Sequence, residues 1–308
     1  MLFAISLLIL SVVILYFGAE ISLDSSEKIG KKLGLSPLAI GMLLVGFGTS
    51  LPELFVGHIA GLQGKIDIAT GSLIGSNIAN MLFILGVCGL FTKMSLSNKK
   101  LMHQILVHLV LGVTLVFVLK SESLSFFSAL PLLLIAFVYL YLLYTDLKND
   151  KTDYPEDQDF KPVPVLIKLI AGFSMLYLGG EILVKAGTDL CLILNISEYI
   201  ISAIFIALGT SFPELVTSII AAKKKKDSDL IIGNIIGSNL FNCAFILGSL
   251  GIYNFKLTAD YSTELALLIA GSIILLLISI LKKHFNYVTG FIFLSGYIYI
   301  VGFWLKIF

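Results

Sequence analysis

The sequence predicts an all-α integral membrane protein with ten transmembrane helices. Of its 308 residues, 57% are hydrophobic and only 13% are charged. The mean hydropathy is +0.99, which lies far above the range of soluble globular domains. Ten apolar stretches approach the roughly 20 residues that a helix needs to cross the hydrocarbon core, and the alternating pattern of a membrane β-barrel is missing. This composition excludes a water-soluble enzyme.

The spans follow one another between clusters of charged and turn-forming residues, and their order is read from hydropathy. In the first half, Lys-containing loops near 28–32, 65, 93–100 and 120 separate five spans, and loops near 185, 223–226, 256 and 282–283 separate five more in the second half. The predicted spans are 2–22, 36–61, 67–91, 101–119, 124–145, 162–186, 196–222, 229–253, 261–281 and 285–305.

One long polar segment divides the chain. Residues 146–161 hold six acidic residues, three Lys and Pro155, a composition that does not bury in a membrane. We therefore expect a first five-helix unit at 1–145, a cytoplasmic linker at 146–161 and a second five-helix unit at 162–308.

The distribution of Lys predicts the orientation. Loops after odd-numbered spans hold fifteen Lys residues, whereas the opposite side holds five, so the positive-inside rule places the Lys-rich side in the cytoplasm. We expect a multi-pass protein of the plasma membrane with both termini outside. The net charge of +1 gives no basic field for a nucleic-acid partner.

The two halves repeat each other at an offset of 161 residues. The segment GTSLPE at 48–53 matches GTSFPE at 209–214, and after a one-residue slip the segment IGSN at 74–77 matches IGSN at 236–239. Because each half has five spans, the second copy enters the membrane from the opposite side. Inverted repeats are typical of secondary transporters, which hold their substrate near the midplane.

Each repeat places one acid deep in the membrane. Glu53 lies eight residues from Gly61 and sixteen from Pro37, and Glu214 lies at a matching depth. An ionisable group there costs at least about 2.5 to 3.5 kcal/mol unless it is paired or hydrated. Two such acids with identical flanks indicate a cation site.

A proline precedes each acid and predicts a helix break, which frees carbonyls near Gly46 and Ala207 to face a cation. Hydroxyls lie three and four residues before each acid, and a hydroxyl and an amide lie four residues apart on the next span. The predicted oxygen ligands are Thr49, Ser50, Glu53, Ser76 and Asn80 in the first half, and Thr210, Ser211, Glu214, Ser238 and Asn242 in the second.

This ligand set is made of oxygen alone, which suits Ca²⁺ and Na⁺ better than zinc or copper. Two ionised Glu side chains carry a charge of −2, which matches one Ca²⁺ or two Na⁺. These ions would compete for one site, and such competition is the basis of antiport.

The paired segments GTSLPEL with GSLIGSNIAN, and GTSFPEL with GNIIGSNLFN, resemble the two alpha repeats of sodium/calcium exchangers in the cation/calcium antiporter (CaCA) superfamily. The likeness covers essentially the whole chain, and the short linker is similar to that of compact prokaryotic members. It implies ten helices in two inverted repeats and a Na⁺/Ca²⁺ antiporter that is not an enzyme, needs no cofactor and functions as a monomer by alternating access.

The resemblance also implies residue roles. Ca²⁺ would be held by Glu53, Glu214 and the carbonyls of Thr49 and Thr210. Na⁺ would use those four residues together with Ser50, Ser76, Ser211, Ser238 and the carbonyls of Gly46 and Ala207, while Asn80 and Asn242 would complete a central site.

One departure leaves alternatives open. Some relatives carry Asp at the position of Asn242, so this chain has one acid fewer and H⁺ as a coupling ion has to be weighed. A Ca²⁺/H⁺ exchanger is the first alternative, because buried Glu residues can trade protons for Ca²⁺. A Ca²⁺-selective channel is the second, because channels also use acids and carbonyls.

Overall fold

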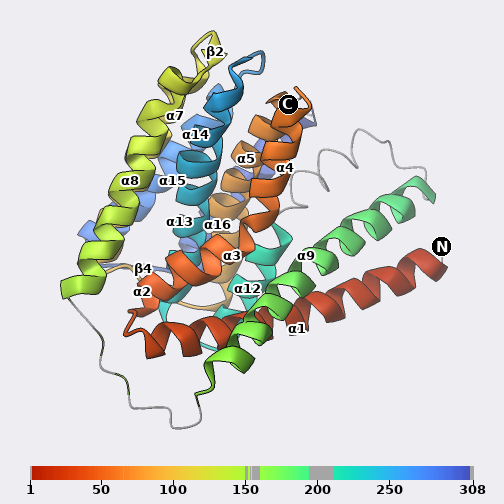
Figure 1. The fold of residues 1–308 in the computed structure, drawn as a ribbon, viewed down its shortest axis with the longest axis vertical. Coiled ribbons are helices and arrows are strands. Elements are labelled where there is room, and N and C mark those ends of the chain that lie inside the picture. Colours follow the sequence, from red (N-terminus) through yellow and green to blue (C-terminus); the bar gives the residue numbers. More distant parts are fainter. Residues whose placement is uncertain are drawn as a thin grey trace.

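The computed structural model describes residues 2–64, 66–149, 152, 154, 160–193 and 211–305. Two long helices, α1 (Leu2–Lys32) and α9 (Pro162–Ile193), lie side by side and slant across one side of a helical bundle (Figure 1). Glycines allow this contact: a Cβ on Gly18 would lie 2.9 Å from the Cβ of Met175, and one on Gly172 would lie 2.7 Å from the backbone nitrogen of Ser22. Such small residues let membrane helices approach closely.

Both long helices continue past the predicted spans, which ended at 22 and 186. In α1 the added turns are polar, and Asp24 pairs with Lys28 at 2.9 Å while Glu27 pairs with Lys31 at 3.4 Å. These pairs have the i, i+4 spacing that stabilises exposed helix. The helix therefore extends beyond its apolar span, because hydropathy marks the end of the membrane and not the end of the helix.

The second predicted span is broken. It consists of α2 (Pro37–Ala39), the π-helix η1 (Ile40–Gly46), α3 (Phe47–Thr49) and α4 (Leu51–Leu62). The chain bends by 44° between 37–49 and 51–62, and Ser50, at the bend, has φ −89° and ψ 7°. Pro52 lies just after the bend, where it cannot donate a backbone hydrogen bond. The predicted break at the proline is thus confirmed.

The remaining helices of the first half run in the predicted order. They are α5 (Ile66–Ile78), the π-helix η2 (Ala79–Ile84), α6 (Leu85–Phe91), α7 (Lys99–Leu119) and α8 (Phe126–Asn149). The second half contains α12 (Phe212–Lys223), α13 (Ser228–Leu240), the π-helix η4 (Phe241–Ile246), α14 (Leu247–Ser249), the 3₁₀-helix η5 (Leu250–Tyr253), α15 (Ser262–Ile280) and α16 (Tyr287–Trp304).

The all-α membrane class is confirmed. Within the described ranges, eight helices are long and apolar enough to cross a membrane, and nine spans result if the bent pair counts as one. The predicted span at 196–222 falls partly on 194–210, which lies outside the described residues, so the count of ten stays a prediction.

Two short strand pairs join the halves, and no strand is predicted at these positions. Strand β1 (Met94–Ser95) pairs antiparallel with β4 (His284–Phe285), and β2 (Ser123–Leu124) pairs with β3 (Phe255–Lys256). An offset of 161 residues relates β1 to β3 and β2 to β4. Each pair thus joins one strand from each half, and the two pairs are equivalent under the sequence repeat.

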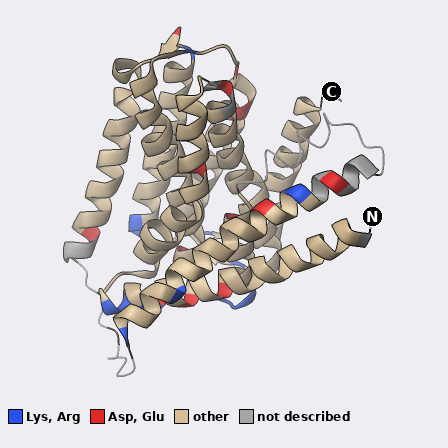
Figure 2. Ribbon diagram, turned by 45° about the vertical axis from the view of Figure 1, so that its right-hand side comes forward, with Lys and Arg blue, Asp and Glu red and all other residues tan. Residues whose placement is uncertain are grey.

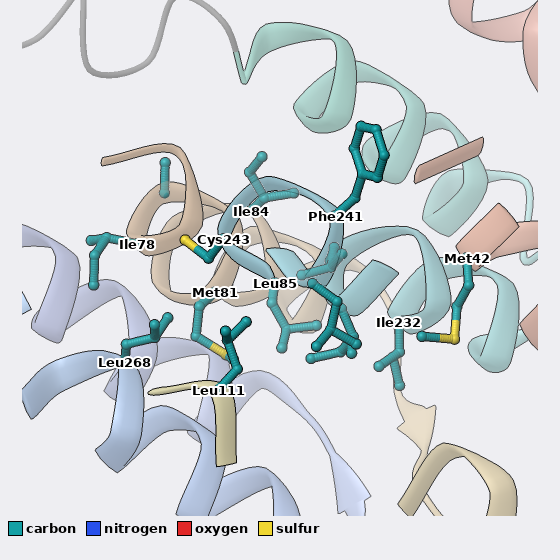
Figure 3. Packing of buried hydrophobic residues seen from close by; sticks show 14 of the residues in the cluster. Met42, Ile78, Met81, Ile84, Leu85, Leu111, Ile232, Phe241, Cys243 and Leu268 are labelled. Atoms are coloured by element: carbon teal, nitrogen blue, oxygen red, sulfur yellow. The ribbon is translucent and has the colours of Figure 1, made fainter. Parts of the chain in front are cut away.

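The interior is apolar and draws on both halves. Figure 3 shows buried hydrophobic side chains that come from η1, η2, α7, η4 and α15, among them Met42, Met81, Leu111, Phe241 and Leu268. Lysines gather outside this interior: Figure 2 shows Lys positions where α1 ends and α9 begins. Lys224, just after α12, pairs with Glu20 of α1 at 2.5 Å. The polar residues inside the bundle therefore stand out against a hydrocarbon-like background.

Candidate ion-binding site

The broken helix carries the first acid into the interior. Glu53 lies in the first turn of α4, only 1% exposed. The Ser76 hydroxyl, from α5, donates a hydrogen bond to Glu53 Oε1 at 3.1 Å. The carboxylate therefore sits at a helix N-terminus, where the helix dipole favours negative charge, and contacts the span predicted to share its site.

The second acid has the same local structure. Glu214 lies in the first turn of α12 and is fully buried. Ser211, which precedes this helix, has φ −87° and ψ 3°, nearly the values of Ser50. The matched backbone angles follow from the matched sequences, since a proline occupies the second helical position in both.

Hydroxyl groups connect the two acids into one cluster. Ser50, three residues before Glu53, donates to Glu214 Oε1 at 3.0 Å. Ser211, three residues before Glu214, donates to the Ser76 hydroxyl at 2.8 Å. Each half thus supplies a hydroxyl to the other half, and the structure brings these five predicted residues together.

The two central amides differ in their partners. Asn242 Nδ2, on η4, donates to the Ser76 hydroxyl at 3.3 Å. Asn80 Nδ2, on η2, donates to Asn239 Oδ1 at 3.1 Å. Both side chains are fully buried. Asn242 therefore contacts the hydroxyl cluster directly, whereas Asn80 is hydrogen-bonded to a residue of α13.

Several buried oxygens in this region accept no hydrogen bond. Among the described residues they include Glu214 Oε2, Asn80 Oδ1 and Asn242 Oδ1. A buried polar atom without a partner is costly, and each such atom calls for an explanation. A bound cation would supply the missing partner for all three, and carboxylate, amide and hydroxyl oxygens are ligands that hard cations accept.

The Gly46 carbonyl is an acceptor for three donors. Ser238 Oγ donates to it at 3.2 Å, Thr49 Oγ1 at 3.3 Å and the Ser50 backbone N–H at 3.2 Å. We predicted carbonyls freed by the break in this stretch. The bend lies at Ser50, one turn further on, so the Gly46 carbonyl still has its helical partner. Two predicted ligands, Ala207 and Thr210, lie outside the described residues.

Glycines bring the broken helix against α13. A Cβ on Gly41 would lie 2.3 Å from the Leu230 carbonyl oxygen, and one on Gly237 would lie 2.7 Å from Met42 Cα. At such distances only glycine fits. The backbones of η1 and α13 are therefore in contact. This contact brings the Ser238 hydroxyl within hydrogen-bond distance of the Gly46 carbonyl. By the sequence repeat, the segment expected to pack against Gly71 and Gly75 lies outside the described residues.

Sequence reasoning missed a polar pair at the centre. Asn77 Nδ2 donates to the Asn239 carbonyl at 3.0 Å, and Asn239 Nδ2 donates to the Asn77 carbonyl at 3.2 Å. The reciprocal bonds join α5 to α13 beside the site. The signal that could have found them is the repeated GSN motif, in which both are the third residue.

Comparison with known proteins gives consistent results. The family model "Sodium/calcium exchanger protein" matches residues 3–145 and 165–306. The inner membrane protein YrbG of Escherichia coli is 33% identical over 80% of this chain and 79% of its own. The sodium/calcium exchanger MaX1 of Methanosarcina acetivorans is 27% identical over 88% and 89%. A solved structure of the sodium-calcium exchanger NCX_Mj superposes with a TM-score of 0.84, at 27% identity over 97% and 98%.

Proposed function

The chain belongs to the sodium/calcium exchanger family, and from this premise we propose that Glu53 and Glu214 bind the same Ca²⁺ ion in a membrane-embedded site. Its activity is Na⁺/Ca²⁺ antiport, and it is a transporter and not an enzyme. The observation that carries the proposed site is the bond of 3.0 Å from Ser50 to Glu214, because it joins the hydroxyl of one acidic motif to the acid of the other.

The hydroxyls explain how the site changes occupant. A serine hydroxyl has one donor and two lone pairs, and it rotates to suit its neighbours. Ser50 and Ser76 donate to the carboxylates. When a cation arrives, both hydroxyls turn their lone pairs towards it and the carboxylate oxygens bind the ion directly. One Ca²⁺ or two Na⁺ balances the two acids, so the ions displace each other.

The Na⁺ ligands of this proposal form two matched groups. One joins Thr49, Ser50 and Ser76 with the Gly46 carbonyl. The other joins Thr210, Ser211 and Ser238 with the Ala207 carbonyl. The hydrogen bond from Ser238 to the Gly46 carbonyl joins a ligand of the second group to a ligand of the first, which supports a shared ion position. Asn80 and Asn242 complete a central position without an acid, which favours Na⁺ over H⁺ as the coupling ion.

Access to the site would run beside α9. The Phe173 ring of that helix lies against Gly48, where a Cβ would be 2.1 Å from the ring. Gly48 is two residues before the bend, so displacement of α9 would uncover the broken helix. We propose two inverted five-helix repeats, 1–145 and 162–308, that act within one monomer. The pairing of β1 with β4 and of β2 with β3 supports this division.

The remaining proposals concern placement in the cell. As a multi-pass membrane protein of this family, the chain fits the plasma membrane of a prokaryote. The Lys-rich loops support a cytoplasmic linker at 146–161 and termini on the outside, by the positive-inside rule.

Equilibrium Ca²⁺ binding by the purified protein tests the shared site. Glu53→Gln and Glu214→Gln should each weaken Ca²⁺ binding by about 100-fold or more, because removing one partner of a buried charge interaction costs about 3 to 5 kcal/mol. Glu181→Gln on α9, an exposed acid in the second half, is the control and should bind normally. Normal Ca²⁺ affinity in either site variant would remove that residue from the site.

A further inference from the structure

A line of buried polar side chains leads from Asn80 to the neighbouring helix α7. Asn80 donates to Asn239 Oδ1 at 3.1 Å, and Asn239 Nδ2 lies 3.1 Å from His108 Nε2. His108 Nδ1 in turn lies 2.9 Å from the Ser272 hydroxyl of α15. All four side chains are fully buried. This line is continuous and crosses four helices, and beyond Asn80 none of its members is a proposed ion ligand.

Backbone carbonyls fix the direction of every bond in the line. The Ser272 hydroxyl donates to the Leu268 carbonyl at 2.7 Å, so it must accept from His108 Nδ1–H. In a neutral imidazole the other nitrogen, Nε2, is then an acceptor. It accepts from Asn239 Nδ2, the same nitrogen that donates to the Asn77 carbonyl.

This direction determines how Asn80 is turned. Since the amide nitrogen of Asn239 is engaged by His108 and the Asn77 carbonyl, its oxygen faces Asn80 and accepts from Asn80 Nδ2. The Asn80 oxygen must then point the other way. That oxygen is buried and accepts no hydrogen bond from the described residues. An amide nitrogen in its place would repel a cation, because N–H groups are donors only.

We propose that His108 is a positioning residue for ion binding: by accepting from Asn239 it holds Asn80 with its oxygen, and not its nitrogen, towards the bound cation. The proposal rests on the proposed function in one respect, namely that Asn80 lines the central site. It adds a residue on α7, a helix that supplies no ligand, to the determinants of cation affinity.

Among the described residues, the second half shows no equivalent line from its central amide to a histidine. Asn77, the repeat partner of Asn239, donates to Cys243 Sγ at 2.9 Å and to a backbone carbonyl. Asn242, the repeat partner of Asn80, donates to the Ser76 hydroxyl. Neither contacts a histidine. His108 therefore acts on one of the two central amides, and its loss should resemble a partial loss of Asn80 alone.

A double-mutant cycle on Ca²⁺ binding by the purified full-length protein tests the proposal. Asn80→Ala should weaken Ca²⁺ affinity about tenfold, the effect of losing one good ligand or hydrogen bond. His108→Phe, which keeps a ring but removes both nitrogens, should weaken it about fivefold when Asn80 is present. In the Asn80→Ala background the same change should have less than about a twofold effect, because coupled residues are not additive.

Two further variants separate positioning from packing. His108→Gln should restore most of the affinity, because a carboxamide can accept from Asn239 and donate to Ser272 at once. Ser272→Ala removes only a hydroxyl. It should weaken Ca²⁺ binding less than His108→Phe does, again only when Asn80 is present. His103→Phe, on the exposed face of α7, is the matched control and should bind as the wild type does.

The outcomes distinguish an error in the central site from an error in the role of His108. If Asn80→Ala binds Ca²⁺ normally, the central site is wrong and the inference falls with it. If Asn80→Ala binds weakly but His108→Phe and Ser272→Ala bind normally, only the inference is overturned. Equal losses from His108→Phe with and without Asn80 would also overturn it, since they would show a structural effect independent of the ligand.

Discussion

Glu53 and Glu214 occupy equivalent places in the first turns of α4 and α12, yet their hydroxyl donors come from different directions. Glu53 accepts from Ser76, which belongs to its own half. Glu214 accepts from Ser50, which belongs to the other half. The duplicated sequence therefore gives two acids the same backbone setting, with the Ser76 and Ser50 donors coming from different halves. The packing of the halves against each other supplies the Ser50 hydroxyl to Glu214.

The hydroxyls on α5 and α13 differ in the same way. Ser76 contacts Glu53, Ser211 and Asn242, whereas its repeat partner Ser238 donates to the Gly46 carbonyl. One serine thus connects three members of the site and the other connects helix backbones. The comparison teaches that equal residues in the two repeats need not carry equal shares of ion affinity.

Replacing the two serines on α5 and α13 should expose this asymmetry most strongly. We expect Ser76→Ala to weaken Ca²⁺ binding about 10- to 100-fold, because a hydrogen bond to a charged group contributes about 1.5 to 3 kcal/mol. Ser238→Ala should cost about 3- to 10-fold, as for a neutral bond. Titration of both purified variants with Ca²⁺ checks the ratio, and equal losses would contradict the unequal roles.

The serines that directly precede α4 and α12 provide a smaller contrast. Ser50 donates to a carboxylate, whereas Ser211 donates to a hydroxyl. We expect Ser50→Ala to weaken Ca²⁺ affinity about tenfold and Ser211→Ala about threefold. Thr289→Ala on α16, far along the chain from both motifs, serves as a control. A larger loss for Ser211→Ala would mean that Glu214 does not depend on the other half.

Part of this site follows from sequence alone. Pro52 predicts where the broken helix resumes, Pro213 predicts where α12 begins, and the four-residue spacing of Ser76 and Asn80 predicts that they share one side of their span. The bond from Ser50 to Glu214 could not be foreseen, because it depends on how two distant helices are rotated against each other. His108 gave no signal either, since a single histidine in an apolar helix has no partner visible in its own segment.

The strand pairs and the helix ends could not be predicted from sequence patterns for a different reason. Strands of two residues, such as β1 and β4, have too few positions to show a period. The added turns of α1 are polar and amphipathic, so hydropathy ends the span before the helix ends. In both places tertiary contacts, and not local preference, decide the structure.

Substitution of the surface acids on the two long helices should give the smallest difference in transport rate. Glu20 on α1 pairs with Lys224, and its carboxylate raises the pKa of that lysine. The pair therefore stays charged through neutral pH and is lost when alkaline pH deprotonates Lys224 or acid pH protonates Glu20. Because exposed pairs contribute little, we expect Glu20→Gln to change the transport rate less than about threefold, and Glu181→Gln not at all.

Transport assays in proteoliposomes at increasing salt concentration check this prediction. The difference between Glu20→Gln and the wild type should shrink as ionic strength rises, because salt screens exposed charges. A tenfold loss of transport that persists in high salt would show instead that Glu20 takes part in the exchange itself.

Radioactive Ca²⁺ uptake into proteoliposomes tests the central claim most directly, namely that Na⁺ and Ca²⁺ compete for one pair of buried acids. Vesicles loaded with Na⁺ are compared with K⁺-loaded vesicles and with an imposed pH gradient at matched voltage. We predict uptake with internal Na⁺ only, and none in vesicles carrying Glu53→Gln or Glu214→Gln. Uptake driven by the pH gradient without Na⁺, or Na⁺-driven uptake by either variant, would contradict the account.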